Sequence, residues 1–368
     1  MNRKKNKYII IGPAEPYKGG IAQYTTQLHN ALGKYSDVKT VSFKRLYPGF
    51  LYRGQTHKIS SGDNIPADHR FLIDCYNPLS LSKTINYILK RQPDVVIIAW
   101  WTLFWQPALH FIARRLKKRN IKVVLLCHNL YDHSGRSIQK YISKKLLKAA
   151  DAYIVHSTEQ YRQLKLLNSN AQILKRLHPI YNQFPDLVEP VKKRGRLELL
   201  FFGLIRPYKG LDTLIAALRR LNDTEVYLTV AGESWGDKTE LLNSVASLAS
   251  NIELNLKYIS DDEVPSYFKR ADVVVLPYIS ATGSGVVALA YNYLKPVLAT
   301  NVGGLRDVVI EGQTGWLIEP NSSEKLAAKI SSITREDAAA MAKNIRQFNK
   351  ENSWDAMAKA ILNFSESL

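Results

Sequence analysis

Eight short apolar runs recur along the chain, and they restrict its fold more than any other feature of the sequence. Each run has the length of a strand, and helical patterns separate most of them. Strands that are apolar on both faces and alternate with helices form parallel sheets, so we predict an α/β protein with doubly wound sheets. The runs cover residues 8–12, 95–100, 123–128 and 152–157, and then 197–203, 226–232, 273–278 and 296–300.

The two sets of four runs predict two domains. The chain has 368 residues, of which 46% are hydrophobic, and this is enough for two cores. Residues 178–196 lie between the sets and combine three prolines with a basic cluster, which is typical of a linker. We therefore predict one domain over residues 1–184 and another over residues 185–353. Residues 42–75 are polar and aromatic, and we expect loops there.

The net positive charge of the chain falls entirely in its first half. Residues 1–190 contain 30 Lys and Arg against 11 Asp and Glu, whereas residues 191–368 contain 21 of each. This asymmetry predicts an anionic partner for the first half: a membrane surface, a phosphorylated acceptor or a nucleic acid. A nucleic acid fits less well, because the chain has no recognisable reading motif and its basic residues are spread along helices.

Two basic segments have amphipathic patterns. Residues 100–120 place three tryptophans and a phenylalanine before a helix that ends in a basic cluster, and residues 138–150 place lysines four residues apart in one row. Such helices can lie on an anionic bilayer, and the alternative is one core face and one solvated lysine face. No apolar run approaches the ~20 residues that span a bilayer. Two cysteines make no disulfide framework. We expect a cytoplasmic protein, peripheral on the inner face of the membrane.

A turn of small residues after the strand at 273–278 is the first candidate binding site. Residues 281–285 read ATGSG, and a helix is expected from about Val286 to Leu294. Unpaired N–H groups and the helix dipole favour an anion at a helix start, and glycines let a phosphate approach the backbone. The pair Gly303-Gly304 repeats the pattern after the next strand. The alternative is a tight crossover between core strands.

Two turns in the first half follow strands in a similar way. Gly19-Gly20 precedes a helix expected from about Ile21 to Leu32. The turn is not GxGxxG, which argues against a dinucleotide fingerprint, but it can bring backbone close to a substrate or phosphate. His128 ends another strand, where a histidine can hydrogen-bond a substrate hydroxyl, and a metal site there lacks a third convincing ligand. Polar side chains follow it in the same loop: Asn129, Asp132 and His133.

The loop after the strand at 197–203 carries two cations. Arg206 and Lys209 lie between Gly203 and Gly210, at the expected carboxyl end of a strand. Two cations at the edge of a sheet can clamp a diphosphate and neutralise a departing charge, whereas the alternative is a basic surface loop. Asp212 is expected to cap the helix that follows.

Together these stretches resemble the retaining GT-B glycosyltransferases of glycosyltransferase family 4. The resemblance implies two facing Rossmann-like domains, with a nucleoside-diphosphate sugar held mainly by the second and a hydroxyl acceptor, lipid-linked or a polysaccharide, held mainly by the first. It implies that residues 354–368 cross back to the first domain, and that neither a metal nor another cofactor is needed. It rests on GGIAQYTTQL at 19–28, LLCHN at 125–129, FFGLIRPYKGLD at 201–212 and KPVLATNVGGLRDVVIEGQTGWLIEP at 295–320.

The resemblance also implies roles for single residues. Lys209, with Arg206 behind it, would hold the donor diphosphate, and His128 would lie near the transferred carbon of the sugar. The nucleobase would meet the backbone around Tyr258 and Ile259. The remaining donor-binding residues implied are Gly19, Gly20, Gly203, Thr282, Gly283, Ser284, Gly285 and Val286.

The chain departs from the family pattern at three positions. Ala281 and Leu289 stand where the family carries two glutamates, one at the sugar and one at the ribose, and Leu204 stands where it carries a clamp arginine. Arg206 is the expected replacement for the arginine. These departures leave two hypotheses: a hexosyltransferase, or a catalytically silent scaffold that binds a nucleotide or a partner protein. Residues that can replace the glutamates are Thr282, Ser284, Tyr291 and Asn292.

Overall fold

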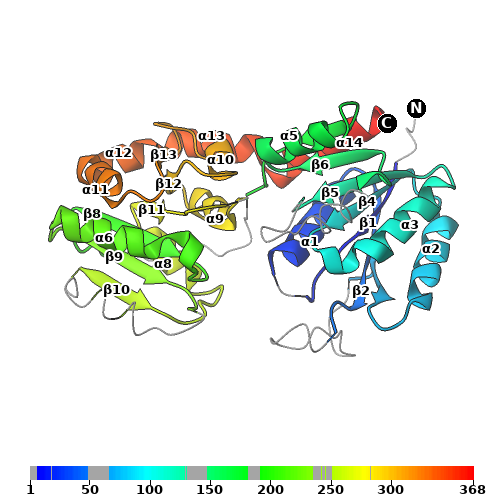
Figure 1. The fold of residues 1–368 in the computed structure, drawn as a ribbon, viewed down its shortest axis with the longest axis horizontal. Coiled ribbons are helices and arrows are strands. Elements are labelled where there is room, and N and C mark those ends of the chain that lie inside the picture. The colour runs from blue at the N-terminus through cyan, green and yellow to red at the C-terminus, as the bar shows by residue number, and fades with distance from the viewer. Residues whose placement is uncertain are drawn as a thin grey trace. The chain divides into compact units, whose positions relative to one another are not determined.

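The chain forms two compact units in a computed structural model (Figure 1). The structure describes residues 6–17, 19–48, 66–128, 130, 147–180, 191–234, 242, 245, 251–281 and 283–368. Unit 1 comprises Met1–Arg176 and Trp354–Leu368, and unit 2 comprises Leu177–Ser353. The last helix of the chain is therefore part of unit 1, and residues 181–190 of the expected linker lie outside the described residues.

Unit 1 is built on a parallel sheet that has seven strands within the described residues, in the order β3-β2-β1-β4-β5-β6-β7. The strands are β1 (Lys7–Ile11), β2 (Asp37–Arg45), β3 (His69–Asp74), β4 (Val95–Trp100), β5 (Lys122–Cys127), β6 (Ala152–Val155) and β7 (Gln172–Lys175). The described helices are α1 (Gly20–Gly33), α2 (Leu79–Arg91), the 3-10 helix η1 (Leu103–Trp105), α3 (Gln106–Lys117), α5 (Thr158–Leu167) and α14 (Trp354–Glu366).

Unit 2 is built on a second parallel sheet, in the order β10-β9-β8-β11-β12-β13. Its strands are β8 (Leu197–Phe202), β9 (Val226–Ala231), β10 (Ile252–Asn255), β11 (Val273–Leu276), β12 (Val297–Thr300) and β13 (Gly315–Ile318). Its described helices are the 3-10 helix η2 (Pro207–Lys209), α6 (Leu211–Leu221), α8 (Val264–Arg270), α9 (Gly285–Asn292), α10 (Leu305–Val308), α11 (Ser323–Ser332), α12 (Arg335–Ala340) and α13 (Ala342–Glu351).

Strand β1 shows why the apolar runs become central strands. Tyr8 and Ile10 belong to the core cluster formed with α1 and α14, whereas Ile9 and Ile11 belong to the cluster on the other side of the sheet, formed with α2 and α3. Each of these four side chains is at most 1% exposed. Burying one such side chain stabilises the fold by roughly 1.5–3 kcal/mol, so a strand apolar on both faces is held from both sides.

All eight predicted strands are confirmed, but the expectation of loops over residues 42–75 is wrong at both of its ends. Strand β2 continues to Arg45, and β3 begins at His69 and pairs with β2 in parallel. Strand β2 alternates apolar with polar residues in the sequence DVKTVSFKR, and β3 has only three consecutive apolar residues in the sequence HRFLID, so neither has the long apolar run that marked the central strands.

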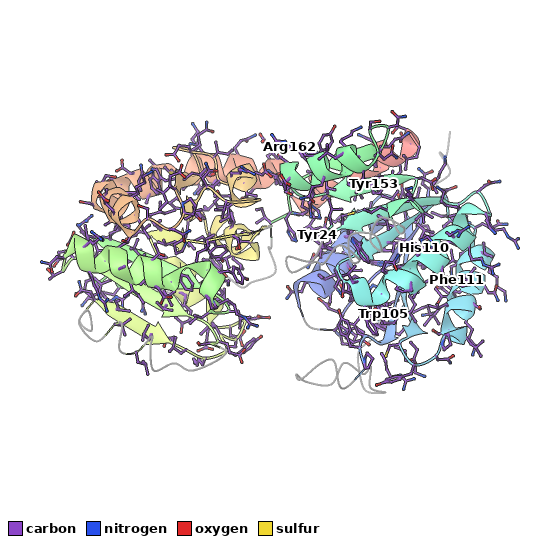
Figure 2. The ribbon with its side chains drawn as sticks, in the orientation of Figure 1. Tyr24, Trp105, His110, Phe111, Tyr153 and Arg162 are labelled. Carbon is purple, nitrogen blue, oxygen red and sulfur yellow. The ribbon has the colours of Figure 1, made fainter. Side chains whose placement is uncertain are left out.

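The aromatic segment before α3 is largely core. Trp100 is 2% and Trp105 is 4% exposed, and the indole N–H of Trp105 donates to the carbonyl of Leu46 at 2.9 Å. Phe104 and Phe111 are each 38% exposed, and Figure 2 marks Phe111 and Trp105 on this part of the unit. Of the two alternatives left open for this segment, Trp100 and Trp105 therefore follow the core face. The segment 138–150 lies mostly outside the described residues. Among the helices that the structure describes, none has the length and apolar character to cross a membrane.

Candidate active site

The start of α9 forms a capped helix N-terminus at the carboxyl edge of the unit 2 sheet. Ser284 is the N-cap residue, and its hydroxyl oxygen accepts a hydrogen bond from the backbone N–H of Val286 at 3.3 Å. The helix begins at Gly285, one residue before the predicted start. Gly283 has open space where a Cβ would lie, and Gly285 is exposed. This leaves backbone N–H groups facing solvent at the positive end of the helix dipole.

Lys209 brings its ammonium to the same edge. A Cβ built on Gly203, at the end of β8, would lie 3.4 Å from Nζ of Lys209 and 3.6 Å from Cγ2 of Val286. The φ of Gly203 is +91°, in the region that favours glycine. The structure therefore places Gly203, Lys209 and the first turn of α9 next to one another, as the sequence predicts for a cation beside a glycine turn.

The side chain of Lys209 is largely buried, so its ammonium gives up part of its solvation at this position. The residue is 8% exposed, and Nζ has no hydrogen-bond partner among the described residues. Burial, with the charge of Arg206 as the smaller cause, lowers the pKa of Lys209 to about 8. Removing a cation from water is costly, and an anion bound beside it would restore the lost interaction.

Tyr278 connects the two anion-binding groups, a role that no sequence pattern predicts. Its ring lies 5.7 Å from Nζ of Lys209, measured to the ring centre, and its hydroxyl shares a hydrogen bond of 3.3 Å with the hydroxyl of Ser284. Tyr278 is 2% exposed, and burial raises the pKa of its phenol to about 12. Thr300 donates from its hydroxyl to the carbonyl of Tyr278 at 2.5 Å. One fixed ring thus positions both the cation and the helix cap.

Gly303 supports the turn at 281–285 through main-chain packing. Its φ is +47°, and a Cβ at this position would lie 1.5 Å from the carbonyl oxygen of Ala281. The turn after β12 therefore packs directly against the backbone of the 281–285 turn. Gly304 is the N-cap of α10, a helix of only four residues. Anion binding at Gly303-Gly304, where the glycine pattern repeats, stays a prediction.

Arg206 and Asp212 are the other charged residues of the loop and helix start around Lys209. Arg206 is half-buried at the N-cap of η2, and its carbonyl accepts from the backbone N–H of Lys209 at 2.9 Å. Asp212 was expected to cap α6, but the N-cap is Gly210 with a φ of +67°, and no side chain caps the helix. Asp212 lies in the first turn of α6, where its charge favours the helix dipole.

The residues expected at the nucleobase lie in the loop after β10. Tyr258 is 69% exposed, whereas Ile259 is 7% exposed and belongs to the core of unit 2. Lys257 is paired with Glu263 at 2.6 Å, and Glu263 also accepts from the hydroxyl and backbone N–H of Ser260. These bonds fix a loop that carries one exposed aromatic ring. Thr282 lies outside the described residues.

His128 lies in unit 1 within an aromatic cluster. Its backbone N–H donates to the carbonyl of Trp100 at 2.9 Å, so it continues the ladder of β5 at the carboxyl edge of the sheet. Its ring meets Tyr24 edge-on at 4.9 Å and lies 5.9 Å from the ring of His156. Tyr24 is fully buried on α1 and also meets the ring of Trp354 at 4.8 Å (Figure 2). The side chain of His128 is half-buried, whereas Asn129, Asp132 and His133 lie outside the described residues.

Gly19 and Gly20 are both exposed at the start of α1. Gly19 is the N-cap with a φ of +114°, and no atom lies within 4 Å of a Cβ built on it. The site residues thus form two described groups: Gly19, Gly20 and His128 in unit 1, and the Lys209, Gly203 and α9 group in unit 2. Among the described residues, no three His, Cys, Asp or Glu side chains are grouped so that they could hold a metal ion.

Two protein-family models match the chain. Glycosyltransferase Family 4 matches residues 18–182, and Glycosyl transferases group 1 matches residues 184–352. An uncharacterized glycosyltransferase of Methanocaldococcus jannaschii is 33% identical over 46% of this chain and 48% of its own. A GDP-mannose:glycolipid 4-beta-D-mannosyltransferase of Xanthomonas campestris is 26% identical over 59% of this chain and 60% of its own. These matches thus span about half the length of the curated relatives.

A solved structure supports the fold over the whole chain. The Anabaena protein HepE in complex with UDP has a TM-score of 0.71 at 18% identity, and the match covers 99% of this chain and 100% of that one. At this identity the likeness shows the fold, which is GT-B, and leaves the ligand of this chain to be inferred from its own residues.

Proposed function

Because the two family models together match residues 18–182 and 184–352, this chain belongs to the glycosyltransferases of the GT-B fold, and we propose that it transfers a hexose-like sugar from a nucleoside diphosphate to a hydroxyl acceptor. The observation that carries the proposal is the largely buried side chain of Lys209, whose ammonium makes no hydrogen bond among the described residues and lies beside Gly203, the first turn of α9 and the ring of Tyr278. Such a pair of a cation and a helix N-terminus suits two linked phosphates. HepE, which shares the fold, is described in complex with UDP-glucose.

The proposed reaction retains the configuration of the sugar. The incoming hydroxyl attacks the anomeric carbon on the face that the diphosphate leaves, and its proton passes to the departing phosphate oxygen. The new C–O bond forms as the old one breaks, and the charge left on the diphosphate is held by Lys209, Arg206 and the N–H groups of α9. No metal is needed in this scheme, because the cations and amides neutralise the charge. Gly20 and His128 are assigned to the phosphates and the sugar by the resemblance.

The proposed acceptor is a lipid-linked sugar or a growing polysaccharide, as in the assembly of a cell-surface polysaccharide or glycolipid. The Xanthomonas relative acts on a glycolipid, and another relative, from Klebsiella pneumoniae, is a protein of the cps region that matches over 88% of this chain. The excess of basic residues in the first half supports transfer at the cytoplasmic face of an anionic membrane.

Turnover of a panel of UDP-, GDP- and ADP-sugars, with Lys209→Ala beside wild type, tests the proposal. One lost charge contact to the leaving group is expected to lower the rate on the order of 100-fold. Equal rates in the two proteins would remove Lys209 from the mechanism. Activity that persists in EDTA, and an NMR spectrum of the product showing the donor's anomeric configuration, check metal independence and retention.

A second candidate function, a silent scaffold that binds a nucleotide or partner protein, is favoured by Ala281 and Leu289. Both side chains pack against the core of unit 2, so neither position presents a carboxylate to a sugar or ribose. Tight nucleotide binding without transfer or donor hydrolysis, across the whole panel, would favour the scaffold.

A further inference from the structure

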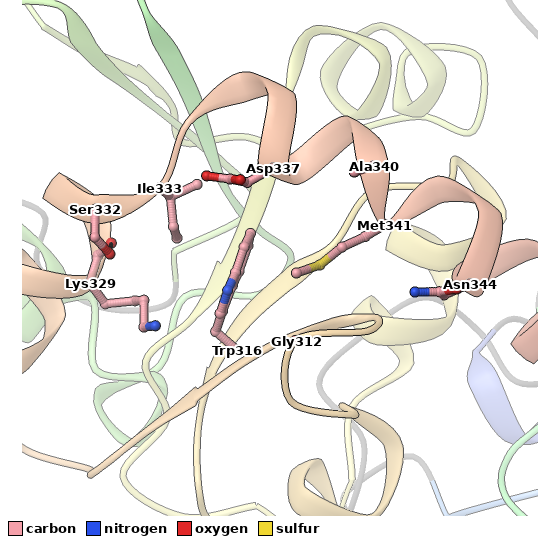
Figure 3. A pocket seen from close by; sticks show the side chains of 9 residues that line it. All are labelled: Gly312, Trp316, Lys329, Ser332, Ile333, Asp337, Ala340, Met341 and Asn344. Atoms are coloured by element: carbon pink, nitrogen blue, oxygen red, sulfur yellow. Dashed lines mark hydrogen bonds between the residues drawn. The ribbon is translucent and has the colours of Figure 1, made fainter.

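Unit 2 contains a cavity of about 390 Å³ that the proposed reaction does not use (Figure 3). It is lined by residues of β13, α11, α12 and α13. Gly315, which precedes Trp316 in β13, pairs with Val297, the first residue of β12. The cavity therefore lies toward the amino ends of these strands, whereas Lys209 and α9 lie at the carboxyl edge of the same sheet. Its volume falls within the roughly 300–1,000 Å³ that is typical of small-molecule sites.

Part of the cavity wall is apolar and buried. Trp316 is 8%, Ile333 2% and Met341 7% exposed, and all three belong to the core of unit 2. Figure 3 shows Lys329 and Met341 directed toward Trp316 from opposite sides. Since these three residues are part of the core, this part of the wall is in place before any ligand enters, which limits the binding energy lost to rearrangement.

The polar side chains of the lining are exposed or half-buried and make few hydrogen bonds among the described residues. The indole N–H of Trp316, the ammonium of Lys329 and the side-chain amide of Asn344 have no hydrogen-bond partner among the described residues. Asp337 accepts from the hydroxyl and backbone N–H of Thr334 through Oδ2 alone, so Oδ1 remains as an acceptor. The cavity thus offers several donors and one strong acceptor around an apolar centre.

The balance of charge points to a neutral ligand. Lys329 and Asp337 are the charged residues of the lining and they cancel, so an anion or a cation gains no net attraction. A pyranose ring has C–H groups on its faces and hydroxyls on its edge, and each hydroxyl both donates and accepts. We propose that this cavity binds a sugar ring of a glycan, at a site separate from the transfer reaction.

Saturation-transfer NMR on the full chain without nucleotide tests the proposal. The probes are the methyl glycosides of glucose, galactose, mannose and N-acetylglucosamine. Ala340 is exposed on α12 and lines the cavity, so Ala340→Trp fills the space without entering the core. Ala339 is exposed on the same helix and does not line it, so Ala339→Trp is the matched control. Asn344→Ala removes one donor and leaves the apolar walls intact.

We expect saturable binding of at least one glycoside, weakened at least about tenfold by Ala340→Trp, which is a loss of about 1.4 kcal/mol. Ala339→Trp should leave binding unchanged, and Asn344→Ala should weaken it several-fold. No saturable binding, equal binding in the two tryptophan variants, or a preference for free uridine or adenosine over every glycoside would overturn the proposal. Sugar transfer assayed on the same preparations separates this result from the proposed function, since Ala340→Trp should leave turnover intact.

Discussion

Lys209 shows a conflict between function and stability in a single side chain. Folding removes its ammonium from water and supplies no hydrogen-bond partner among the described residues, which lowers its pKa from 10.5 to about 8. The folded chain therefore holds this proton less tightly than the unfolded chain does. The associated penalty is fully present below pH 8 and disappears as the pH rises toward 10.5.

Lys209→Met should stabilise the protein at pH 7 while it abolishes nucleotide binding. Each pKa unit corresponds to about 1.4 kcal/mol, so removal of the charge should raise the free energy of unfolding by about 1–3 kcal/mol. Urea denaturation at pH 7 measures the gain, and calorimetric titration with UDP, GDP and ADP measures the loss of binding. The opposite sign, a less stable methionine variant, would mean that the ammonium has a stabilising partner.

At the scale of elements, the site depends on two turns that contact each other through main chain. The turn at 281–285 follows β11, and the turn at Gly303 follows β12, so the two turns lie at the carboxyl ends of paired neighbouring strands. Only a residue without a side chain allows the approach of the Gly303 backbone to the carbonyl of Ala281.

Gly303→Ala should damage both the fold and the site, whereas Gly283→Ala should spare the fold. At Gly303 the new methyl group meets the backbone of Ala281 and the φ is positive, so we expect a loss of about 2–4 kcal/mol in the free energy of unfolding. At Gly283 nothing lies within 4 Å. Thermal melts of the two variants provide the comparison, and similar melting temperatures would show that the turns do not pack as described.

Edge strand β3 begins with a histidine that cannot be charged without cost. His69 is 1% exposed, its ring lies 4.8 Å from that of His29, and neither of its nitrogens has a hydrogen-bond partner among the described residues. Burial, with the His29 charge as a smaller cause and Asp68 opposing, lowers the pKa of His69 to about 4. Between pH 6.5 and pH 4 the unfolded chain binds a proton at this histidine and the folded chain does not. The protein is therefore fully stable in this respect above pH 6.5 and loses stability as the pH falls toward 4.

His69→Phe should reduce the acid sensitivity of the protein. Wild type is expected to lose up to about 3 kcal/mol more than the variant between pH 6.5 and 4, from a shift of about 2.5 units. Denaturant melts at pH 7, 5.5 and 4.5 on both proteins measure the difference. Parallel curves would mean that His69 stays neutral, or finds a partner, in acid.

At the scale of the whole molecule, the uneven distribution of charge is the main surface property of the chain. On α3 the side chains of Leu109, Ile112 and Leu116 are buried, whereas Phe111, Arg114 and Arg115 are exposed, with Arg115 lying 5.2 Å over the Phe111 ring. Lys117 is paired with Asp151 and contributes less to this face. The solvated basic face is thus present, while contact with a membrane is a proposal.

Flotation of the full chain with liposomes should depend on anionic lipid and on salt. We expect binding to vesicles containing phosphatidylserine or phosphatidylglycerol at ~0.1 M salt, where charges interact over about 10 Å, and release at ~1 M, where they interact over about 3 Å. Arg114→Glu with Arg115→Glu should weaken flotation and leave the melting temperature nearly unchanged, because both side chains are exposed. Equal flotation with phosphatidylcholine alone would count against the membrane proposal.

The sequence by itself determined the two parallel sheets, their central strands and the turns that carry the candidate donor site. A strand buried on both faces requires a continuous apolar run, and a glycine turn before a helix is a short motif. Both signals therefore lie in consecutive residues and can be recognised in the sequence. Strands such as β2, β3 and β10 were missed, because they are buried less completely or alternate with polar residues. Only the tertiary structure decided that Tyr278 joins Lys209 to Ser284 and that Trp316 lines a second cavity, since these contacts exist only once residues distant in sequence, or on different elements, are packed together.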